Sequence, residues 1–505
     1  MRALGLESPT QVASTGAACP VVVSQRGPLA FDFGAGGLPA PKPAPGGLAT
    51  TIGAAAVCEP LIWIAAAHSP ADAAAARQTW FHRQAEVRLV PPSATLAGED
   101  GGLANPVLWF LQHGLASSLQ PWRFDPRRQH LWAEEYRQAN ASLVGAAAEV
   151  ANASVFLLQD YHLYLAPALL RRQRPEAPIA HFSHIPWPRS GTWARLAPEL
   201  LRGLLQGLLG ADLLGFQTAA DAANFAATCV TYGVARQEGA WLRGADGRAT
   251  LLRNYPVTVD APSLFNAAAM QGESPALCAR SRQVVLRVDR LDPSKNIPGG
   301  FAAFGRLLEV HPELRGGVEF VAHLVRTREN VPEYRDARDA AREAAEHVNA
   351  RFGTAGWQPI RITLRDDRQL ALAELRRFDV LLANSLADGM NLVAKEGAVL
   401  NERDGVLVLS QRAGAWEELG GWALGVDPTD IDQTARVLHE ALTMPPSERV
   451  IRARRLRHAV ASTSSVNWLN SQVHDALTAH AANVRATAAD GLLARDLASR
   501  HLVTA

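Results

Sequence analysis

Lysine is nearly missing from this 505-residue chain: Lys42, Lys295 and Lys395 are the only lysines among 50 basic residues. The formal net charge is +1, so the composition offers no basic surface for nucleic acid or for an acidic membrane. No stretch of about 18 residues is apolar throughout, and residues 1–20 lack the basic start and apolar middle of a signal peptide. We therefore expect a cytoplasmic protein that does not bind membranes.

Cysteine is scarce as well. The four cysteines have the spacing of neither a metal site nor a redox motif, so we expect buried free thiols. A metal pair formed by His181 and His184 is not expected, because the residues between them are typical of a strand and nothing else completes a ligand set. The sequence thus predicts neither a metal nor a cofactor. The four cysteines are Cys19, Cys58, Cys229 and Cys278.

The length and the residue pattern indicate an α/β protein of more than one domain. With 505 residues, 48% of them apolar, the chain exceeds one hydrophobic core. Short β-branched or leucine-rich runs alternate with longer stretches of helical period, as in stacked βα units. Polar or charged side chains follow these runs, which is typical of ligand sites outside the carboxyl ends of parallel strands. The side chains at these ends are Arg26, Asp160, His184, Arg328, Asp388 and Gln411.

This pattern predicts two facing Rossmann-like domains with the active site in the cleft between them. The rhythm of strands and helices breaks near residues 262–282, which are rich in small residues and contain Gly272 and Pro275. Residues 35–45, rich in glycine and proline, are predicted to be a mobile loop. The predicted parts are a flexible N-terminus (1–18), an N-terminal Rossmann-like domain (19–265), a C-terminal Rossmann-like domain (282–465), and C-terminal helices (466–505) that pack back on the N-terminal domain.

Arg290 and Lys295 are the first candidate ligand-binding pair. Two such cations are ordinarily solvated surface groups, but here a buried strand is predicted over 284–288 and the cations follow where it stops. Residues 296–300 then form a predicted turn into a helix. Cations at the carboxyl end of a buried strand lie where open α/β sheets bind ligands. A planar guanidinium beside a compact ammonium suits a diphosphate.

The segment Asp388–Glu396 is the second candidate. It is predicted to open a helix after the buried run 380–383, with Asp388 near the N-cap. Because a helix N-terminus binds anions, the amides from Met390 to Val393 are expected to hold a phosphate or sugar hydroxyls. Glu396 is either a surface helix acid or a carboxylate that bridges two ribose hydroxyls.

Eight segments together resemble the trehalose-6-phosphate synthase family, the retaining glycosyltransferases of family 20. The likeness runs in order from about residue 19 to about residue 480, and the segment Asp388–Glu396 is highly specific. The resemblance implies a GT-B type fold of two Rossmann-like domains. The eight segments are Val21–Arg26, Gly46–Leu48, Asp160–Leu163, His184–Pro188, Gly215–Thr218, Arg290–Lys295, Asp388–Glu396 and Gly405–Gln411.

The resemblance implies roles for residues on the donor side. The positions matching Arg290 and Lys295 hold the donor diphosphate, and the one matching Glu396 holds the ribose. Those matching His184 and Asp388 contact the donor sugar. The other donor-binding positions implied are Gly47, in a loop that closes over the donor, and Gly389, Met390, Asn391, Leu392 and Val393.

On the acceptor side, Arg26 and Arg328 match two arginines that clamp the acceptor's phosphate. Asp160 and Trp109 match contacts to the acceptor sugar. Two arginines from opposite domains can meet on one phosphate only in a closed cleft, which would couple acceptor binding to domain closure. The catalytic set implied by the resemblance is Asp160, His184, Arg290, Lys295 and Asp388.

The implied reaction is transfer of glucose or a similar sugar, with retention, from a UDP-, GDP- or ADP-linked sugar to a phosphorylated acceptor. The leaving phosphate takes the acceptor's proton, so no general base is required. The protein then contributes positioning, stabilisation of charge on the departing diphosphate, and exclusion of water. The expected partners are these small molecules, and the sequence leaves a homo-oligomer open.

Several positions depart from the family pattern. Asp100 and Ala66 stand where the family has aromatic residues, and each lost stacking surface costs on the order of 1 kcal/mol. Pro293 and Asn296 replace the tyrosine and glycine of the Arg-x4-Lys loop, and Thr258 replaces a glycine. Two related reactions therefore stay open, namely glucosylglycerol-phosphate synthesis and the pseudo-glycosyl coupling of a nucleotide-linked cyclitol to an aminocyclitol phosphate. Relatives of the second, validoxylamine type also resemble the chain at residues 401–404.

Two other classes of protein are less well supported. A glycoside hydrolase needs two facing carboxylates, for which Asp160 and Asp388 could be imagined, but it has no use for a set of four cations. A non-catalytic sensor of sugar phosphates would be expected to lack a donor-side residue, and none is missing from the sequence.

Overall fold

The computed structural model describes residues 18–44, 47–56, 60–91, 102–269 and 282–502. The predicted flexible N-terminus lies outside this range except for residue 18, and Asp100, Cys58 and Cys278 also lie outside it. The chain divides into two compact units, which we call the first unit and the second unit. The first unit comprises Met1–Ala97, Trp122–Tyr255 and Leu469–Ala505; the second unit comprises Gly98–Pro121 and Pro256–Trp468.

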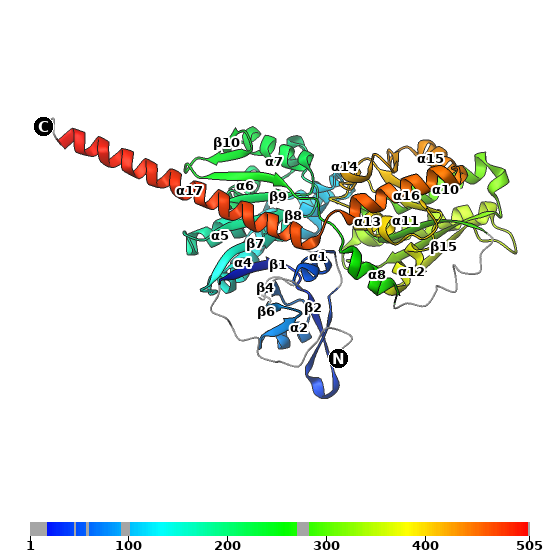
Figure 1. Cartoon of the computed structure of the whole chain (residues 1–505), viewed down its shortest axis with the longest axis horizontal. Helices are drawn as coiled ribbons and strands as arrows, with labels where there is room; N and C mark the ends of the chain where they lie inside the picture. The colour runs from blue at the N-terminus through cyan, green and yellow to red at the C-terminus, as the bar shows by residue number, and fades with distance from the viewer. Residues whose placement is uncertain (1–17, 45–46, 57–59, 92–101, 270–281, 503–505) are drawn as a thin grey trace. The chain divides into compact units, whose positions relative to one another are not determined.

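The first unit is built on a ten-stranded sheet (Figure 1). Its order is β10-β11-β12-β9-β8-β7-β1-β4-β6-β5, and all neighbours from β12 to β6 are parallel, whereas β10, β11 and β5 pair antiparallel at the edges. The strands are β1 (Cys19–Ser24), β4 (Leu61–Ala66), β5 (Trp80–His82), β6 (Ala85–Val90), β7 (Ala153–Gln159), β8 (Ile179–Ser183), β9 (Leu213–Phe216), β10 (Ala235–Glu238), β11 (Trp241–Gly244) and β12 (Ala249–Asn254).

Some helices of the first unit begin at residues whose side chains accept from the free amides of the first turn. Asp125 accepts from the amides of Arg127 and Arg128 at the start of α4, and Thr218 caps α7 by accepting from the Asp221 amide. The helices are α1 (Gly47–Ala55), α2 (Pro70–Ala75), α4 (Pro126–Ala148), α5 (Ala166–Gln173), α6 (Pro198–Leu208), α7 (Ala219–Thr231) and the long C-terminal α17 (Ser465–Leu502).

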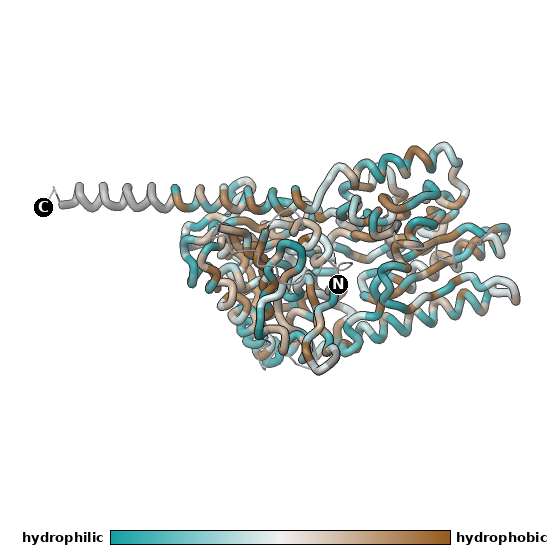
Figure 2. Tube along the Cα trace, turned by 60° about the horizontal axis from the view of Figure 1, so that its bottom comes forward, coloured by the Kyte–Doolittle hydropathy of each residue, from teal (hydrophilic) through white to brown (hydrophobic). Residues whose placement is uncertain are grey.

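Helix α17 belongs to the first unit from Leu469 onward, and hydrogen bonds of its polar side chains attach it to the rest of that unit. Asn483 donates to the Asp212 carboxylate at 3.0 Å and to the Ala249 carbonyl at 2.9 Å, and Tyr255 donates to Asp475 at 2.6 Å. Hydrophobic and hydrophilic residues alternate along the part of this helix that is coloured by hydropathy in Figure 2. The alternation leaves apolar positions for packing and polar positions for these hydrogen bonds.

The prediction of a mobile loop over residues 35–45 is wrong for most of the segment. Strand β3 (Pro39–Pro43) pairs antiparallel with β2 (Leu29–Phe33) to form a separate hairpin (Figure 1). Prolines occupy alternate positions of β3, so the missing N–H groups all fall on one edge of the strand. Proline is tolerated on an edge strand that does not need donors on that side.

The second unit contains a six-stranded, fully parallel sheet of order β15-β14-β13-β16-β17-β18. Its strands are β13 (Gln283–Arg290), β14 (Val318–Val325), β15 (Ile360–Leu364), β16 (Val380–Ala383), β17 (Val406–Ser410) and β18 (Leu424–Val426). Its helices are α3 (Trp109–Gln112), α8 (Ala261–Ala269), α10 (Ile297–Val310), α11 (Pro332–Phe352), α12 (Arg368–Leu375), α13 (Leu392–Leu400), α14 (Trp416–Leu419), α15 (Ile431–Thr443) and α16 (Pro446–Ala461).

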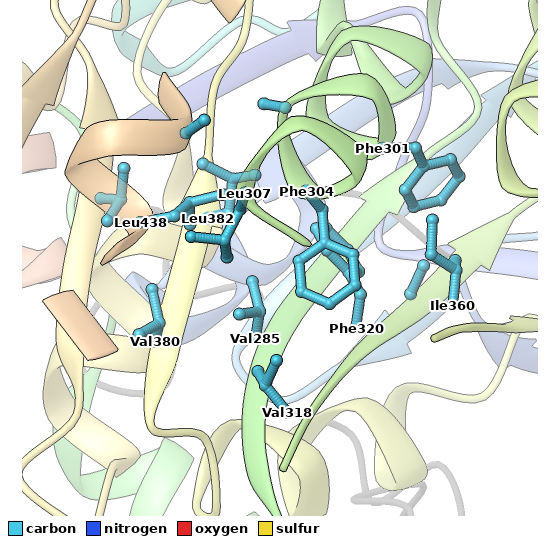
Figure 3. Packing of buried hydrophobic residues seen from close by; sticks show 14 of the residues in the cluster. Val285, Phe301, Phe304, Leu307, Val318, Phe320, Ile360, Val380, Leu382 and Leu438 are labelled. Atoms are coloured by element: carbon cyan, nitrogen blue, oxygen red, sulfur yellow. The ribbon is translucent and has the colours of Figure 1, made fainter. Parts of the chain in front are cut away.

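One hydrophobic core joins this sheet to α10 and α15 (Figure 3). Phe301 and Phe304 of α10 each meet the ring of Phe320 edge to face, with centroid distances of 5.2 and 5.4 Å. Leu438 of α15 and Val285 of β13 belong to the same cluster. The core therefore fixes the position of α10, which begins directly after the predicted diphosphate loop.

The segment Gly98–Pro121 differs from the predicted domain bounds, because it groups with the second unit. The physical reason is aromatic packing: Trp109 and Phe110 contact Tyr334, with ring centroids 5.6 and 5.9 Å apart. No helix within the described residues is long and apolar enough to span a bilayer. The strands predicted at the carboxyl-end motifs are confirmed in both sheets, and so is the α/β class.

Candidate functional site

Lys295 lies at the carboxyl end of β13 in a single 3-10 turn, Pro293–Lys295. Its Nζ is 2.7 Å from Oδ2 of Asp388 and 3.3 Å from Oδ1 of Asp289, and its side chain is 13% exposed. Burial by itself would lower the pKa of Lys295, but the two carboxylates raise it well above its ordinary value. The pKa of Asp388 is lowered, because Lys295 outweighs the effect of burial. The pair is thus fully charged near neutral pH.

Arg287 holds the backbone of the loop that carries Lys295. It is not among the residues predicted from the sequence. The guanidinium of Arg287 is fully buried, donates to Asp289 at 2.8 Å and also donates to the backbone carbonyls of Lys295 and Asn296. A Cβ at Gly300 would come within 2.6 Å of this guanidinium, so the helix start needs glycine there. The signal in the sequence is a charged residue in the middle of an otherwise apolar strand.

Asn296 replaces a glycine of the family pattern, and the structure explains how. It adopts a left-handed conformation (φ 54°, ψ 43°), which asparagine tolerates better than most residues. Its side chain donates to the Pro428 carbonyl at 2.7 Å and fixes the turn to the segment before α15. An asparagine in a left-handed conformation, held by this hydrogen bond, thus forms the turn that follows Lys295.

Arg290 occupies the last position of β13, and its side chain is half exposed. It pairs with Asp292, whose Oδ2 lies 2.5 Å from the guanidinium Nη2. Asp292 is buried, and its other oxygen, Oδ1, is buried without a hydrogen-bond partner within the described residues. Burial alone would raise the pKa of Asp292, but Arg290 and its neighbouring cations hold it below its usual range. Asp292 thus orients a guanidinium that remains accessible to an anion.

The helix predicted to begin at Asp388 begins later, so the prediction that Asp388 lies near the N-cap is wrong. The N-cap of α13 is Asn391 (φ 82°), whose side chain accepts from the Ala394 amide at 3.0 Å. Asp388 instead accepts from Lys295 and from the Asn391 side chain. Asparagine at a left-handed position can cap in its place because its short amide reaches the first turn.

This correction changes which amides can meet an anion. The first turn of α13 leaves the amides of Leu392 and Val393 without intrahelical acceptors, while Gly389 and Met390 belong to the preceding loop. Glu396, on the second turn, is nearly buried and accepts from Arg368 of α12 at 2.9 Å. Arg368 has no counterpart in the sequence-based prediction, because its contact with Glu396 crosses 28 residues.

Trp109 and Arg328 meet within the second unit. The Arg328 guanidinium lies 5.5 Å from the Trp109 ring centre and 5.3 Å from that of Tyr334, and it donates to the Tyr334 hydroxyl. His113 stacks on Trp109 with a centroid distance of 4.1 Å. Burial lowers the pKa of His113 to about 4, against the opposing effect of a hydrogen bond with the Trp109 carbonyl. Tyr334 and His113 are absent from the sequence-based prediction.

In the first unit, Asp160 and His184 also lie together. Oδ1 of Asp160 accepts from the His184 amide at 3.1 Å. Asp160 has φ 75° and ψ 171°, a conformation that is costly for any residue with a Cβ. Strain of this kind at a strand end persists only where surrounding contacts enforce it, and such residues cluster at functional sites.

His184 is a neutral imidazole in a defined tautomer. Its Nε2 donates to Oε1 of Gln159 at 2.9 Å, and its Nδ1 accepts from Gln217 at 3.4 Å. Burial, together with a smaller effect of its neighbour His181, lowers the pKa of His184 to about 3. His184 therefore carries no proton to give as an imidazolium near neutral pH, which fits a reaction without a general acid on this residue.

Arg26 and Gly47 complete the predicted set in the first unit. Arg26 follows β1, and the pairing of Ser24 with Gln159 brings the ends of β1 and β7 to the same edge of the sheet. The Ser24 hydroxyl donates to the Arg26 carbonyl at 2.7 Å and accepts from the Trp63 indole at 2.8 Å. Gly47 is the exposed first residue of α1.

The strand pairing thus gathers the predicted residues at one edge of each sheet. In the first unit, Arg26, Asp160 and His184 follow the adjacent strands β1, β7 and β8. In the second unit, Arg290, Arg328 and Asp388 follow the adjacent strands β13, β14 and β16. Carboxyl ends of parallel strands are where open α/β sheets bind their ligands.

Acid should destabilise the first unit through His181, whose side chain is buried and whose pKa is lowered to about 4 by that burial. The unfolded histidine takes up a proton near its ordinary pKa of 6.5, whereas the folded one does not. Above pH 6.5, protonation of this histidine therefore does not reduce the free energy of unfolding. The free energy of unfolding falls as the pH drops toward 4, and the loss is about 2 kcal/mol at pH 5.

The measurement is urea denaturation at about pH 8 and about pH 5 of the native protein and of H181Q. The free energy of unfolding should change between the two pH values by about 2 kcal/mol less in the variant than in the native protein. At about pH 8 the histidine is neutral in both the folded and the unfolded chain, so a difference between the two proteins there measures the change in packing alone. The carboxylates are the same in both proteins, so their titration cancels in the comparison. An unchanged pH difference would contradict the assignment.

Comparison with known proteins gives consistent matches. The family model for glycosyltransferase family 20 matches residues 20–478. The bifunctional trehalose-6-phosphate synthase/phosphatase of Thermoproteus tenax is 33% identical over 395 residues, covering 75% of this chain and 52% of that protein. The chain therefore spans about half the length of that relative.

Two solved structures are also similar. One, from E. coli, is described as trehalose-6-phosphate bound with UDP-2-fluoro glucose; it is 28% identical, has a TM-score of 0.79, and the match covers 90% of this chain and 98% of that one. The other is a UDP-forming alpha,alpha-trehalose-phosphate synthase from Burkholderia xenovorans in complex with glucose-6-phosphate. It is 29% identical with a TM-score of 0.76, over 91% of this chain and 100% of that one. Together with the two sheets, these matches confirm the expected GT-B type of α/β fold.

Proposed function

Because the chain belongs to glycosyltransferase family 20, we propose that it transfers glucose, with retention, from UDP-glucose to glucose 6-phosphate. The observation that carries the proposal is the arrangement at the carboxyl ends of β13 and β16, where Arg290, Lys295 and the first turn of α13 share one edge of the sheet. Two cations and a helix N-terminus suit a nucleoside diphosphate. The named ligands of the two similar solved structures supply the choice of UDP and of glucose 6-phosphate.

On the donor side, Arg290 and Lys295 would hold the diphosphate. Lys295 is the compact charge, fixed by Asp388 at 2.7 Å, and Arg290 is the planar fork, fixed by Asp292. The amides of Leu392 and Val393 would complete the anion site, and Glu396 would accept from ribose hydroxyls in place of, or beside, Arg368. Contacts within the protein hold these groups in place, so little reorganisation is needed when charge develops on the leaving group.

The reaction would break the bond between the sugar C1 and the diphosphate oxygen and form a bond from C1 to the acceptor oxygen on the same face. The acceptor's proton would go to the departing phosphate oxygen. No side chain is needed as a base, and the neutral His184 fits that requirement. Asp388 and His184 would orient the donor sugar, and the cations would stabilise the leaving diphosphate.

On the acceptor side, Trp109 and Asp160 would contact the sugar, while Arg26 and Arg328 would bind its phosphate. The support for Arg328 is its setting between two aromatic rings, which orients the guanidinium without neutralising it. The comparisons favour trehalose 6-phosphate as product over glucosylglycerol phosphate and over the cyclitol-coupled product.

The test is nucleotide release by the purified chain, with product masses recorded. UDP-, GDP- and ADP-glucose are each combined with glucose 6-phosphate, with glycerol 3-phosphate and with no acceptor. The proposal expects UDP release that depends on glucose 6-phosphate, together with a product of the mass of trehalose 6-phosphate. Release with glycerol 3-phosphate alone would assign the other product. Silence throughout, with thermal stabilisation by one nucleoside diphosphate, would overturn glucosyl transfer in favour of cyclitol coupling or sensing.

A further inference from the structure

In the second unit, the side chains of two histidines and a glutamate lie close together, apart from the candidate site described above. One ligand atom from each of His311, Glu313 and His439 lies within 4.8 Å of the other two. The imidazole rings of His311 and His439 are stacked, with centroids 3.6 Å apart and planes at 8°. Nδ1 of His311 is 2.9 Å from Oε1 of Glu313. Among the described residues, this is the one group of three such ligands that comes together.

Three different backbone elements bring these side chains together. His311 is the C-cap of α10, and Pro312 then begins a 3-10 turn that carries Glu313. His439 lies on α15, the neighbouring helix. The two helices are further fixed to each other by Arg306 of α10, which donates to Asp432 of α15 at 2.7 Å. The backbone of the cluster is therefore held independently of any ligand.

The three side chains are of the types that transition metals bind. Imidazole nitrogens and a carboxylate oxygen are the ligand atoms that zinc and its neighbours in the first transition row accept, and one such atom from each residue lies within reach of the other two.

We propose that His311, Glu313 and His439 form a binding site for a divalent transition metal of the zinc class, with water completing the coordination. Imidazole ligands favour Zn²⁺, Ni²⁺ or Cu²⁺ over the hard cations Mg²⁺ and Ca²⁺. A metal lies in the plane of each imidazole that binds it, so one of the two stacked rings must tilt to share the ion. His311 is 27% exposed and Glu313 is 62% exposed, which leaves room for that tilt and for entry of the ion.

The bound ion would join the carboxyl end of α10 to α15. Helix α10 has 14 residues, so the cluster lies about 20 Å along the helix from the Lys295 turn. A metal there would stabilise the second unit by binding only its folded state, and it would not touch the donor loop. The site and its test are thus independent of the proposed glucosyl transfer.

The experiment titrates Zn²⁺ into the metal-free full chain, purified without a histidine tag, and follows heat and thermal unfolding. We expect binding of one ion with a rise in the unfolding temperature, no response to Mg²⁺, and affinity that falls tenfold or more from about pH 8 to about pH 6 as the imidazoles take up protons. H439Q and E313Q should each weaken binding at least about tenfold. H347Q, at an exposed histidine of α11, is the matched control and should bind as the native protein does.

The same titration with Co²⁺ gives a second readout, because visible absorption bands report coordination by nitrogen ligands. Bands that appear with the native chain and H347Q but not with H439Q support the site. Equal Zn²⁺ affinity in all four proteins, or no binding by the native chain at micromolar concentration, would overturn it. Both the Zn²⁺ titration and the Co²⁺ spectra measure metal binding directly, so neither depends on enzymatic turnover. The substituted side chains are partly exposed.

Discussion

Substitution of Lys295 by methionine is expected to reduce the rate of glucosyl transfer about a thousandfold. Lys295 is one of three lysines in the chain and the one placed at the carboxyl end of β13. Removing one preorganised group that stabilises developing charge typically costs 10²–10³ in rate, and here the group carries a full charge. Methionine retains the length of the side chain, so the loss reports the charge rather than a cavity.

The same substitution leaves Asp388 and Asp289 without their shared cation. Two carboxylates would then face the incoming diphosphate, so donor affinity should also fall. Initial rates at varied UDP-glucose and fixed glucose 6-phosphate separate the fall in kcat from the rise in the donor KM. Thermal unfolding of K295M shows whether the variant is folded.

Lys42 provides the matched control. Its side chain is 51% exposed and pairs with the exposed Asp32 in the β2–β3 hairpin, so K42M should keep native kinetics. K295M with kcat and donor KM within about threefold of the native values would remove Lys295 from the donor site and would weaken the proposed function as a whole.

Scarcity of lysine is a useful signal, and the structure shows its limit. Lys295 lies at the carboxyl end of a buried strand, as predicted, but Lys395 is a buried structural residue. Its Nζ donates to the Val257 carbonyl at 2.7 Å and pairs with Glu418 at 2.5 Å. A retained lysine therefore indicates that a compact ammonium is needed, and only the surroundings show whether the need is catalytic or structural.

The strands and the residues that follow them could be predicted because both depend on local pattern. An apolar run such as Val406–Ser410 is stable only in the interior of a parallel sheet. Its carboxyl end then lies at the edge of the sheet where α/β proteins bind ligands. Contacts that span long stretches of sequence could not be predicted in this way. His113 stacks on Trp109 in a segment that belongs to the second unit although it lies far from the rest of that unit in the sequence. Arg368 donates to Glu396 from another helix.

Two of the errors of prediction arise where the local sequence allows two conformations. Aspartate favours the N-cap position, which is why Asp388 is predicted there, but Lys295 competes for its carboxylate and Asn391 caps α13 instead. Residues 35–45 contain the glycines and prolines of a loop, yet alternate spacing of proline allows an edge strand. In both places a tertiary or cross-strand partner decides between two locally acceptable conformations.

Substitution of Arg328 by alanine is expected to raise the KM for glucose 6-phosphate about a hundredfold and to change kcat much less. An arginine that binds a phosphate through two charge-assisted hydrogen bonds contributes about 3 kcal/mol, which corresponds to that factor. Arg328 is held over Trp109 and Tyr334, so contacts within the protein orient its guanidinium. Arg290→Ala, on the donor side, should instead abolish turnover with every acceptor.

The control is Arg326→Ala, two residues earlier, where the side chain is 59% exposed and lies 3.8 Å from Glu329. It carries the same charge on the same loop, so a general electrostatic effect would appear in both variants. The decisive comparison uses glucose without a phosphate as acceptor. If Arg328 binds the phosphate, R328A and the native protein should use glucose equally poorly, and the penalty should appear only with glucose 6-phosphate. An equal penalty with both acceptors would assign Arg328 to the sugar or to the donor and would contradict the phosphate clamp.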